Sequence, residues 1–414
     1  MSAPASADGG TVLAVNAGSS SLKYGLYGRE GKALWTGCYE GLQPGGQAQH
    51  RQQQPLPGLP EPLNLGANTN SFDAALADLL ARLDRQGALP LAIAHRIVHG
   101  GERCVAPCRL DAGTMAYLHS LSPLAPLHQP HNLAGVNALA RLLPRLPQIG
   151  CFDTAFHAEQ PAVEQWLPLP RALRAQGLRR YGFHGLSYQY LSETLARHSR
   201  RSRGRAILAH LGNGASVCAT LDGSSIASSM GFSALDGLMM GSRSGAVDPG
   251  ALLHLLRQGW SVERLEQTLY KASGLLGVSG LSADMRTLRA SPEAAAAEAI
   301  ALFCHRLRRE AAALLAPLQG LDLLAFTGGI GEHDAGVREA LCDSLGFLGL
   351  QLDRQRNAAA SGQGVQALHS STSAVEVWLV PTDEGRVAAS AAWRWLDAEA
   401  RSAPAQRAAS TLSV

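Results

Sequence analysis

Short apolar runs separated by small polar turns open the chain and predict strands. TVLAVN (11–16) is apolar and β-branched, LKYGLY (22–27) follows after the loop AGSSS (17–21), and KALWTGCYE (32–40) comes third. Apolar runs of this length, bounded by turn residues, are typical of buried strands. The pattern therefore predicts a β-meander whose first turn is rich in glycine and serine.

The rest of the first half alternates helical and strand patterns. Residues 41–70 are rich in Gln, Pro and Gly, and we interpret them as an irregular surface excursion without chemistry. Ser71 is expected to cap a helix whose apolar stripe ends at Gly87. Further predicted elements are a strand at 91–96, a helix at 132–143 and a strand at 148–152 that ends at Asp153.

The strand pattern begins again after about residue 155. RAILAHL (205–211), the loop GNGAS (212–216) and SVCATL (216–221) repeat the order strand, small-residue turn, strand, and Asp222-Gly223 predicts a hairpin. Helical patterns follow both copies. This duplication predicts an α/β fold with two related domains that face each other, each offering a Gly-rich turn to a shared cleft.

Helical patterns dominate the remainder of the chain. The predicted elements are helices at 251–259, 261–273 and from Pro292 to about Leu315, a strand at 321–327 with GGIGE (328–332) as its turn, a helix from about Asp334, a strand at 375–380, and TDEG (382–385) leading into a final helix. The tail after about residue 400 is expected to be disordered.

Composition and charge exclude several classes of protein. The net charge of +3 is too small to indicate binding to nucleic acid or to an anionic membrane. No apolar run approaches the roughly 18 residues of a membrane helix, and the first ten residues lack the features of a signal peptide. Seven scattered cysteines without a CxxC pair favour reduced thiols over a metal or disulfide framework, so a cytoplasmic location is expected.

Three small-residue turns are candidates for binding phosphate. NAGSSSLK (16–23), LGNGAS (211–216) and TGGIGE (327–332) each follow a predicted buried strand directly. Glycine and serine let the backbone approach a ligand closely, and consecutive N–H groups form an anion-binding concavity. One such turn is usually only a tight turn, but three together favour a nucleotide site, and none fits a Walker or Rossmann pattern.

Arginine and histidine recur in short loops bounded by glycine or proline. Arg96 stands at a strand end, His184 lies between glycines in RRYGFHGLS, and Arg243 lies in the Gly/Ser loop MMGSRSGAVDP. Because catalytic groups are commonly displayed on such loops, we favour a functional role over a structural one for these three residues. For His99 and His131 the sequence leaves both interpretations open.

Two acidic residues stand at the ends of strands. Asp153 closes the strand in CFDTAFH, and Glu384 lies at a strand-to-helix turn. Isolated acids are more often helix caps than catalysts, but ligand sites in α/β proteins form at strand ends. A magnesium ion requires only one or two carboxylates besides waters and phosphates, so both residues are candidates.

Ten motifs, in order along the chain, resemble those of the acetate kinase family. They are NAGSSSLK, HRIVHGGE, LAPLHQPHN, FDTAFH, RRYGFHGLS, HLGNGAS, GLMMGSRSG, SGLSADMR, FTGGIGE and the TDE near the end, between about residues 11 and 396. The resemblance implies two actin-like, ribonuclease-H-like domains around a central cleft. Residues 1–154 with 385–414 would form the first domain, and residues 155–384 the second, with the nucleotide site and the interface of a homodimer.

The resemblance also implies an activity and a set of site residues. The activity is the reversible transfer of the γ-phosphoryl group of ATP to acetate, giving acetyl phosphate and ADP, with Mg²⁺ or Mn²⁺ as the cofactor. Asn16 and Glu384 would bind the metal, and the residues around the transferring phosphoryl group would be Arg96, His128, Asp153, His184 and Arg243. The methyl pocket of acetate would be lined by Val98, Leu127 and Phe183, with Arg96 binding the substrate as well. ATP would be bound by Ser19, Ser21, Lys23, His210, Leu211, Gly212, Asn213, Gly214, Asp284, Met285, Arg286, Gly329, Ile330 and Gly331.

The chemistry of a carboxylate substrate agrees with such a site. A carboxylic acid with a pKa of about 4–5 is ionised at neutral pH and needs no general base. The difficulty is to bring an anion to a polyanion, which requires cations and hydrogen-bond donors. We therefore predict direct in-line transfer without a phosphoenzyme, in which Arg243 stabilises the equatorial oxygens and Asp153 helps to position magnesium.

The chain departs from the family pattern at three places. Ala234 in GFSALDG replaces a usual proline beside the methyl pocket, so we expect propionate to be used well. Gly385 and Arg386 replace the usual Glu and Leu, although Glu384 itself is retained. His131 is an added histidine whose role the sequence does not assign.

Other functions remain open from the residues alone. A propionate or butyrate kinase would use the same fold. A sugar or polyol kinase, with Asp153 as a base on a hydroxyl, is disfavoured by the cation-rich site. An actin-like ATPase that acts as a chaperone or assembly protein is disfavoured because only a short polar tail follows residue 400.

Overall fold

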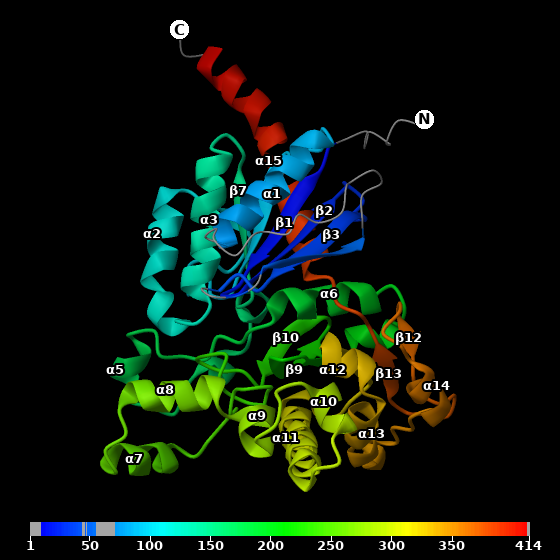
Figure 1. Cartoon of the computed structure of the whole chain (residues 1–414). Coiled ribbons are helices and arrows are strands. Elements are labelled where there is room, and N and C mark those ends of the chain that lie inside the picture. The colour runs from blue at the N-terminus through cyan, green and yellow to red at the C-terminus, as the bar shows by residue number, and fades with distance from the viewer. Residues whose placement is uncertain (1–9, 44–45, 47, 55–70, 412–414) are drawn as a thin grey trace. The chain divides into compact units, whose positions relative to one another are not determined.

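The computed structural model describes residues 10–43, 46, 48–54 and 71–411, and the chain divides into two compact units. The first unit consists of residues 1–155 and 383–414, and the second of residues 156–382. Each unit is built on one mixed sheet (Figure 1). Glu384, which we expected to close the second domain, belongs to the first unit.

A seven-stranded sheet in the order β4-β3-β2-β1-β5-β7-β6 forms the centre of the first unit. Its strands are β1 (Val12–Ala17), β2 (Ser21–Tyr27), β3 (Ala33–Glu40), β4 (Gln49–Gln54), β5 (Ala92–Ile97), β6 (Cys108–Arg109) and β7 (Gln148–Phe152). The first four strands form an antiparallel meander, whereas β5 lies parallel to both β1 and β7. The carboxyl ends of β1, β5 and β7 therefore meet on one side of the sheet.

Helices cover both faces of this sheet, because both faces are apolar. They are α1 (Ser71–Arg85), α2 (Ala112–Ser120), α3 (Gln129–Leu142) and α15 (Glu384–Thr411), with the 3₁₀ turns η1 (Ser122–Leu124) and, at the boundary between the units, η2 (Ala155–His157). Leu13 and Val15 of β1 share a core with α1 and α3, while α15 packs against β1 and β5. Val12 and Ala14, which alternate with them along the strand, are buried as well.

The second unit contains a six-stranded sheet in the order β10-β9-β8-β11-β13-β12. Its strands are β8 (Arg205–Leu211), β9 (Ala215–Leu221), β10 (Ser224–Ser228), β11 (Leu323–Thr327), β12 (Gln366–Ala367) and β13 (Glu376–Leu379). β8, β9 and β10 are antiparallel, whereas β11 lies parallel to β8 and β13. Asp222 and Gly223 join β9 to β10 with φ values of 50° and 76°, the left-handed pair of a two-residue hairpin.

The helices of the second unit surround this sheet. They are α4 (Ala162–Gln165), α5 (Arg171–Arg174), α6 (Gly185–Leu195), α7 (Pro249–Arg257), α8 (Val262–Lys271), α9 (Gly274–Ser279), α10 (Met285–Ala290), α11 (Ala294–Leu318), α12 (Gly328–His333), α13 (Ala335–Ser344) and α14 (Arg354–Ala359), with η3 (Arg200–Arg203) and η4 (Gly346–Leu348). Tyr188 and Leu191 of α6 share a core with Leu208 of β8. In the described part of the chain, no helix combines the length and the apolar character needed to cross a membrane.

The two sheets share one topology, as the repeated sequence pattern predicted. The order β3-β2-β1-β5-β7 corresponds strand for strand to β10-β9-β8-β11-β13, with three antiparallel strands followed by two parallel ones. The prediction of two related α/β halves is therefore confirmed, and a small-residue turn joins the first two strands of each.

Several expectations about local structure are wrong. Strand β4 lies within the segment 41–70 that we interpreted as irregular; residues 44–45, 47 and 55–70 of that segment lie outside the described part. Helix α3 begins at Gln129, earlier than expected, because Pro130 fits its first turn, where no backbone donor is needed. The sequence did not predict the short strands β6 and β12 or the helices α2, α4, α5, α6, α9, α10 and α14.

The remaining differences concern two helices. GGIGE forms most of α12 instead of a simple turn, because packing overrides the poor helix propensity of glycine. The end of the chain, expected to be disordered, is helical as far as Thr411, in keeping with its many alanines.

Candidate active site

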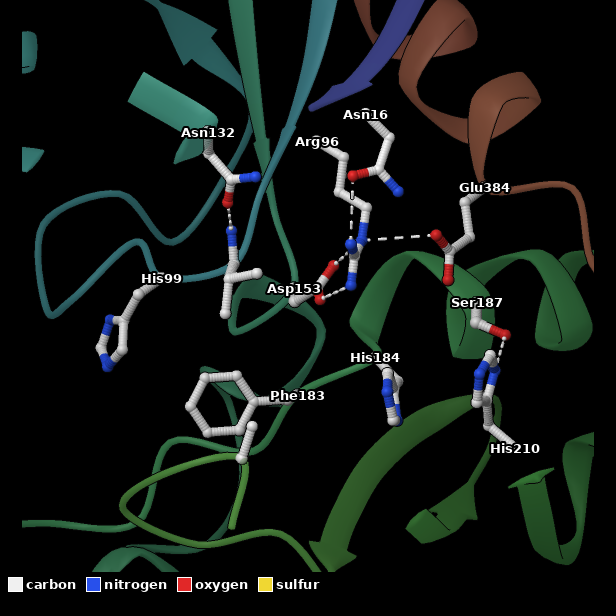
Figure 2. A network of polar contacts seen from close by, with 12 residues as sticks. Asn16, Arg96, His99, Asn132, Asp153, Phe183, His184, Ser187, His210 and Glu384 are labelled. Atoms are coloured by element: carbon white, nitrogen blue, oxygen red, sulfur yellow. Dashed lines mark hydrogen bonds and ion pairs between the residues drawn. The ribbon is translucent and has the colours of Figure 1, made fainter. Parts of the chain in front are cut away.

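Four polar side chains meet where β1, β5 and β7 end in the first unit. Asn16 lies on β1, Arg96 on β5, Asp153 directly after β7 and Glu384 at the start of α15 (Figure 2). Arg96 forms a bidentate ion pair with Asp153, with Nη2–Oδ2 at 2.5 Å and Nε–Oδ1 at 3.0 Å. Its Nη1 donates to Asn16 Oδ1 at 3.3 Å, and its Nε lies 3.3 Å from Glu384 Oε2. We call these residues the Arg96 cluster.

The charges of the Arg96 cluster do not balance. Burial alone would lower the pKa of Arg96, but the carboxylates of Asp153 and Glu384 outweigh burial and raise it. The guanidinium therefore stays charged, and one positive charge faces two negative ones. Because the Asp153 side chain is only 1% exposed, solvent does little to screen it. The surplus negative charge, together with the amide oxygen of Asn16, suits a hard divalent cation.

Asn132 of α3 links the two chain segments that carry this cluster. Its Oδ1 accepts from Val98 N at 3.0 Å, and its Nδ2 donates to Ala17 O at 2.6 Å. Ala17 follows Asn16 along β1, and Val98 lies two residues beyond Arg96. The Asn132 side chain is buried, so both hydrogen bonds are desolvated. The sequence analysis missed Asn132, although its place in the HQPHN motif was a signal.

His99 stabilises the same loop. Gln129 accepts from His99 N at 3.1 Å and donates to His99 O at 2.9 Å, and His99 Nδ1 accepts from Gly101 N at 2.9 Å. Burial lowers the pKa of His99 to about 4, so the ring is neutral at physiological pH. These contacts support the structural interpretation of His99, which the sequence left open. His131 is exposed on α3.

The turn between β1 and β2 presents a lysine beside the Arg96 cluster. Gly18 N donates to Ser21 O at 2.8 Å and closes the turn, in which Ser19 is exposed. Lys23 pairs directly with Asn16 in the sheet register, so their side chains project from the same face. Lys23 is exposed and is available to an anionic ligand.

The other candidates of the first unit lie beside α3. His128 is the N-cap residue of this helix and is half-buried, as is Leu127 before it. Val98 is buried, and its backbone N–H donates a hydrogen bond to Asn132 Oδ1.

In the second unit, the turn between β8 and β9 brings a histidine and an arginine together. Gly212 N donates to Gly214 O at 3.0 Å and closes the turn. A Cβ atom on Gly214 would lie 2.6 Å from Arg243 Nη2 and 3.3 Å from His184 Nε2. The close approach of both side chains therefore requires glycine at this position.

Ala234 contributes to this arrangement through its backbone. Its carbonyl accepts a hydrogen bond from Arg243 Nη1 at 2.6 Å. This contact holds one side of the guanidinium and leaves Nη2 directed at Gly214. Ala234 was singled out for its small side chain, but the structure adds a role for its carbonyl.

His184 occupies a strained position at the start of α6. Its φ of 59° lies in the left-handed region, which is uncommon for a residue with a side chain. Nδ1 lies 2.8 Å from Ser216 Oγ, and the ring stacks on His210 with centroids 4.2 Å apart. His210 Nδ1 in turn lies 2.8 Å from Ser187 Oγ (Figure 2). Each ring of the stacked pair is therefore oriented by a serine.

His157 fixes the residue that precedes His184. Its Nε2 donates to Phe183 O at 2.9 Å, and its Nδ1 lies 2.8 Å from Ser225 Oγ. A Cβ atom on Gly182, whose φ is 75°, would lie 2.5 Å from the His157 ring. Burial lowers the pKa of His157 to about 4, so it acts as a neutral anchor. The sequence analysis missed this histidine within FDTAFH.

A pocket of about 920 Å³ adjoins the β8–β9 turn. Its walls are formed by Gly212, Asn213, Ala283, Asp284, Met285, Arg286, Arg289, Ala290, Gly329, Ile330, His333, Asp334 and Ala335. Asp284 accepts from Arg286 N at 2.8 Å and pairs with the Arg286 guanidinium, and these hydrogen bonds lower the pKa of Asp284 to about 2. Apolar walls with a few fixed polar groups are typical of a nucleoside pocket.

The pocket brings together seven of the expected ATP residues. These are Gly212, Asn213, Asp284, Met285, Arg286, Gly329 and Ile330, whereas His210, Leu211, Gly214 and Gly331 do not line it. The sequence analysis missed Arg289, His333 and Asp334. Arg289 lies one helical turn after Arg286 on α10, a spacing that could have revealed it, and it pairs with Asp334 at 2.9 Å.

Comparisons with known proteins agree on one family. A family model described as the Acetokinase family matches residues 11–390. An acetate kinase of Rhodopseudomonas palustris (strain ATCC BAA-98 / CGA009) is 45% identical over 395 residues, which span 93% of this chain and 98% of that protein. An acetate kinase of Methylocella silvestris is 42% identical over 388 residues, which span 90% of this chain and 95% of that protein.

Solved structures with the same fold include two related kinases. A propionate kinase from Francisella tularensis subsp. tularensis is 33% identical, with a TM-score of 0.83, over 92% of this chain and 98% of that one. An acetate kinase of Porphyromonas gingivalis is 34% identical, with a TM-score of 0.79 and the same coverage.

Proposed function

The chain belongs to the acetate kinase family, and from this premise we propose that it reversibly transfers the γ-phosphoryl group of ATP to acetate, forming acetyl phosphate and ADP. The observation that carries the proposal lies within the second unit. The pocket shares Gly212 and Asn213 with the β8–β9 turn, and His184 and Arg243 approach Gly214 in that turn. A nucleoside in the pocket would direct its phosphates along the turn toward these two donors.

Arg243 and His184 supply what the transfer of a phosphoryl group to a carboxylate demands. The group passes through a transition state with charge spread over its oxygens, so fixed donors stabilise it. The acceptor is already an anion and needs no base. The position of Asp153 is consistent with this mechanism, because its carboxylate is paired with the Arg96 guanidinium.

The Arg96 cluster fits a magnesium ion. Oxygen atoms of Asn16, Asp153 and Glu384 would hold it, since hard cations prefer carboxylate and amide oxygens. When bound, magnesium neutralises phosphate charge, and manganese can take its place. We expect Glu384→Gln to raise the magnesium concentration for half-maximal activity, whereas Glu399→Gln, an exposed substitution on the same helix, leaves it unchanged. An unchanged magnesium dependence in the Glu384 variant would remove this residue from the metal site.

A direct assay tests the proposed reaction. The purified chain is incubated with ATP, magnesium and acetate, and the acyl phosphate is trapped as the hydroxamate. Product formation with acetate is the expected result. The acyl-kinase function is rejected if acetate, propionate and butyrate all fail to give product.

A specific feature of the chain favours propionate as a second substrate. Ala234 holds Arg243 through its carbonyl and lacks the proline ring expected at this position. A pocket rarely separates homologues that differ by one methylene by more than about 1–3 kcal/mol. We expect a kcat/KM for propionate within about tenfold of that for acetate, and a lower ratio in Ala234→Pro. A strong preference of the native chain against propionate would refute this expectation.

A homodimer is proposed through the second unit. Its helices α7, α8 and α9 carry large apolar side chains that are exposed, including Leu253, Leu256, Val262 and Val278. Solvent-facing apolar side chains in this number suit an interface with a second copy. Light scattering should give twice the mass of the chain, and the double variant Leu253→Glu with Val262→Glu should give the mass of one chain. A monomeric native chain would refute the proposal.

A cytoplasmic location is proposed from the seven free cysteines.

A further inference from the structure

The chemistry of His184 depends on which ring nitrogen carries its proton. A neutral imidazole donates a hydrogen bond from one nitrogen and accepts at the other. Nε2 is the nitrogen that approaches Gly214 together with Arg243 Nη2, on the side of the phosphate turn. Nδ1 faces the interior of the unit, where it meets Ser216 Oγ at 2.8 Å. To donate to a phosphoryl oxygen, the ring must carry its proton on Nε2.

A chain of buried hydroxyl groups leads to the inner nitrogen. Ser216 Oγ lies between His184 Nδ1, at 2.8 Å, and the Tyr188 hydroxyl, at 2.5 Å. The side chains of Ser216 and Tyr188 are fully buried. The hydroxyl groups thus form a continuous series, Tyr188 to Ser216 to His184.

The directions of these hydrogen bonds follow by elimination. The Tyr188 hydroxyl is fully buried, and Ser216 Oγ is the acceptor that the described residues offer to its hydrogen, which would otherwise stay unsatisfied. Ser216 therefore accepts from Tyr188 and must donate its own hydrogen to His184 Nδ1. A nitrogen that accepts this hydrogen bond carries no proton, so the proton of the neutral ring resides on Nε2.

We propose that Ser216 and Tyr188 are positioning residues that hold His184 in its Nε2–H tautomer, so that it donates to the transferring phosphoryl group. The proposal rests on the proposed function, in which His184 and Arg243 face that group. Ser216 comes directly after the phosphate turn, at the start of β9, and Tyr188 lies one helical turn beyond His184 on α6. One strand and one helix therefore set the proton of the ring through two hydroxyl groups.

The hydrogen bonds of His210, which stacks on His184, assign its proton to the other ring nitrogen. Ser187 Oγ donates to Thr382 Oγ1 at 3.0 Å, so it accepts from His210 Nδ1 at 2.8 Å. His210 therefore carries its proton on Nδ1 when it is neutral. The two stacked rings are thus assigned opposite tautomers by neighbouring serines, Ser187 and Ser216, and each serves as a control for the other.

Nitrogen NMR of the ring-¹⁵N-histidine-labelled full-length chain tests the tautomers directly. With His184→Gln and His210→Gln used for assignment, we expect His184 to show an unprotonated Nδ1 and a protonated Nε2, and His210 the reverse. Ser216→Ala should release His184 to a mixture of tautomers and leave His210 unchanged, and Ser187→Ala should do the converse. A protonated Nδ1 in the native His184 overturns the proposal, as does a native-like His184 spectrum in Ser216→Ala.

Steady-state kinetics connect the tautomer with the reaction. Ser216→Ala and Tyr188→Phe should lower kcat about tenfold or more while the KM values for acetate and ATP change little, because the loss of a partner that orients a metal-ligating histidine costs about 10–100-fold and His184 would lose its orientation in the same way. Ser216→Thr, which retains the hydroxyl, should restore most of the rate. Ser202→Ala removes another buried hydroxyl, on η3, and should leave kcat unchanged.

The NMR and kinetic measurements test the tautomer of His184 and its role in catalysis separately. If Ser216→Ala changes the His184 tautomer but not kcat, the proposed role in catalysis is overturned, and with it the placing of His184 at the phosphoryl group. If the wild-type chain forms no acyl phosphate, the proposed function fails, while the NMR result still decides the tautomer.

Discussion

At the scale of single residues, the site depends on small side chains that allow large polar ones to come close. Gly214 leaves room for Arg243 and His184, and Gly182 leaves room for the ring of His157. Ala234 is another small residue beside Arg243, and its carbonyl anchors the guanidinium. The chemistry of the arginine and the histidine is therefore inseparable from the residues that have little or no side chain.

Arg243 is the residue whose removal should cost the most rate. An arginine that stabilises a phosphoryl transition state contributes about 10³–10⁵ in kcat, so we expect a loss in this range for Arg243→Ala. Arg243→Lys retains the charge but not the planar fork that binds both Ala234 O and the phosphoryl group, and it should recover only part. Steady-state kinetics measure both variants, with thermal unfolding as the control. Near-normal turnover in Arg243→Ala would contradict the assigned role.

Gly214→Ala tests the close approach of the two donors. Its Cβ atom would lie 2.6 Å from Arg243 Nη2 and force the guanidinium aside. A displacement of about 1 Å at a reacting group can cost about 10²-fold, and we expect kcat to fall by about that factor. Gly346→Ala is the matched control, because no atom lies near the added methyl group and its φ is not positive. Equal rates for the two variants would show that the close approach of Arg243 and His184 to Gly214 does not contribute to activity.

At the scale of secondary-structure elements, α3 acts as a clamp on the ends of two strands. Asn132 hydrogen-bonds to the backbone of the last residue of β1 and to the backbone just after β5, and Gln129 holds the His99 backbone from the same helix. The first turn of α3 therefore fixes the separation between the segments that carry Asn16 and Arg96.

Asn132→Asp is a nearly isosteric test of this clamp. An aspartate can accept from Val98 N, but its second oxygen would face Ala17 O, and the lost donor leaves a buried carbonyl unsatisfied. Such a loss costs about 1–3 kcal/mol, and we expect that decrease in the free energy of unfolding together with a lower kcat. Urea titration and kinetics measure the two effects. Ala134→Asp adds the same charge on the exposed face of α3, and equal stability of both variants would argue against the clamp.

At the scale of the whole molecule, buried histidines couple folding to pH. Burial lowers the pKa values of His95, His99 and His157 to about 4, whereas an unfolded chain titrates at about 6.5. Between these values the unfolded chain binds more protons than the folded one. Stability is therefore complete above about pH 6.5 and is lost as the pH falls toward 4.

The expected slope can be measured. Each histidine contributes about 1.4 kcal/mol per pH unit within this window, so the three together give about 4 kcal/mol per unit, and His50, whose pKa burial also lowers to about 4, adds about as much as each of them. Urea titrations between pH 7 and pH 5 should show this loss, and His157→Gln should reduce the slope by one proton. His131→Gln, on an exposed residue, should leave the slope unchanged. A stability that is flat across this range would mean that the buried rings are protonated in the folded state.

Local patterns of apolar and turn residues were sufficient to predict the repeated topology, the small-residue turns after β1 and β8, and the strands other than β4, β6 and β12. Resemblance of ten motifs was enough to indicate the family that the comparisons show. It also named the residues of the Arg96 cluster, although the ion pairs within that cluster join β5 to the end of β7 and to the start of α15, which are far apart in the chain.

Only the tertiary structure decided how those residues are connected. Asn132, His157 and Ser216 carry no signature of their own, since their roles are hydrogen bonds to atoms between 26 and 115 positions away. The helical state of GGIGE was likewise set by packing against β8, against the propensity of its glycines. Local patterns specify elements because neighbouring residues suffice for them, whereas the geometry of a site exists only after distant segments have packed.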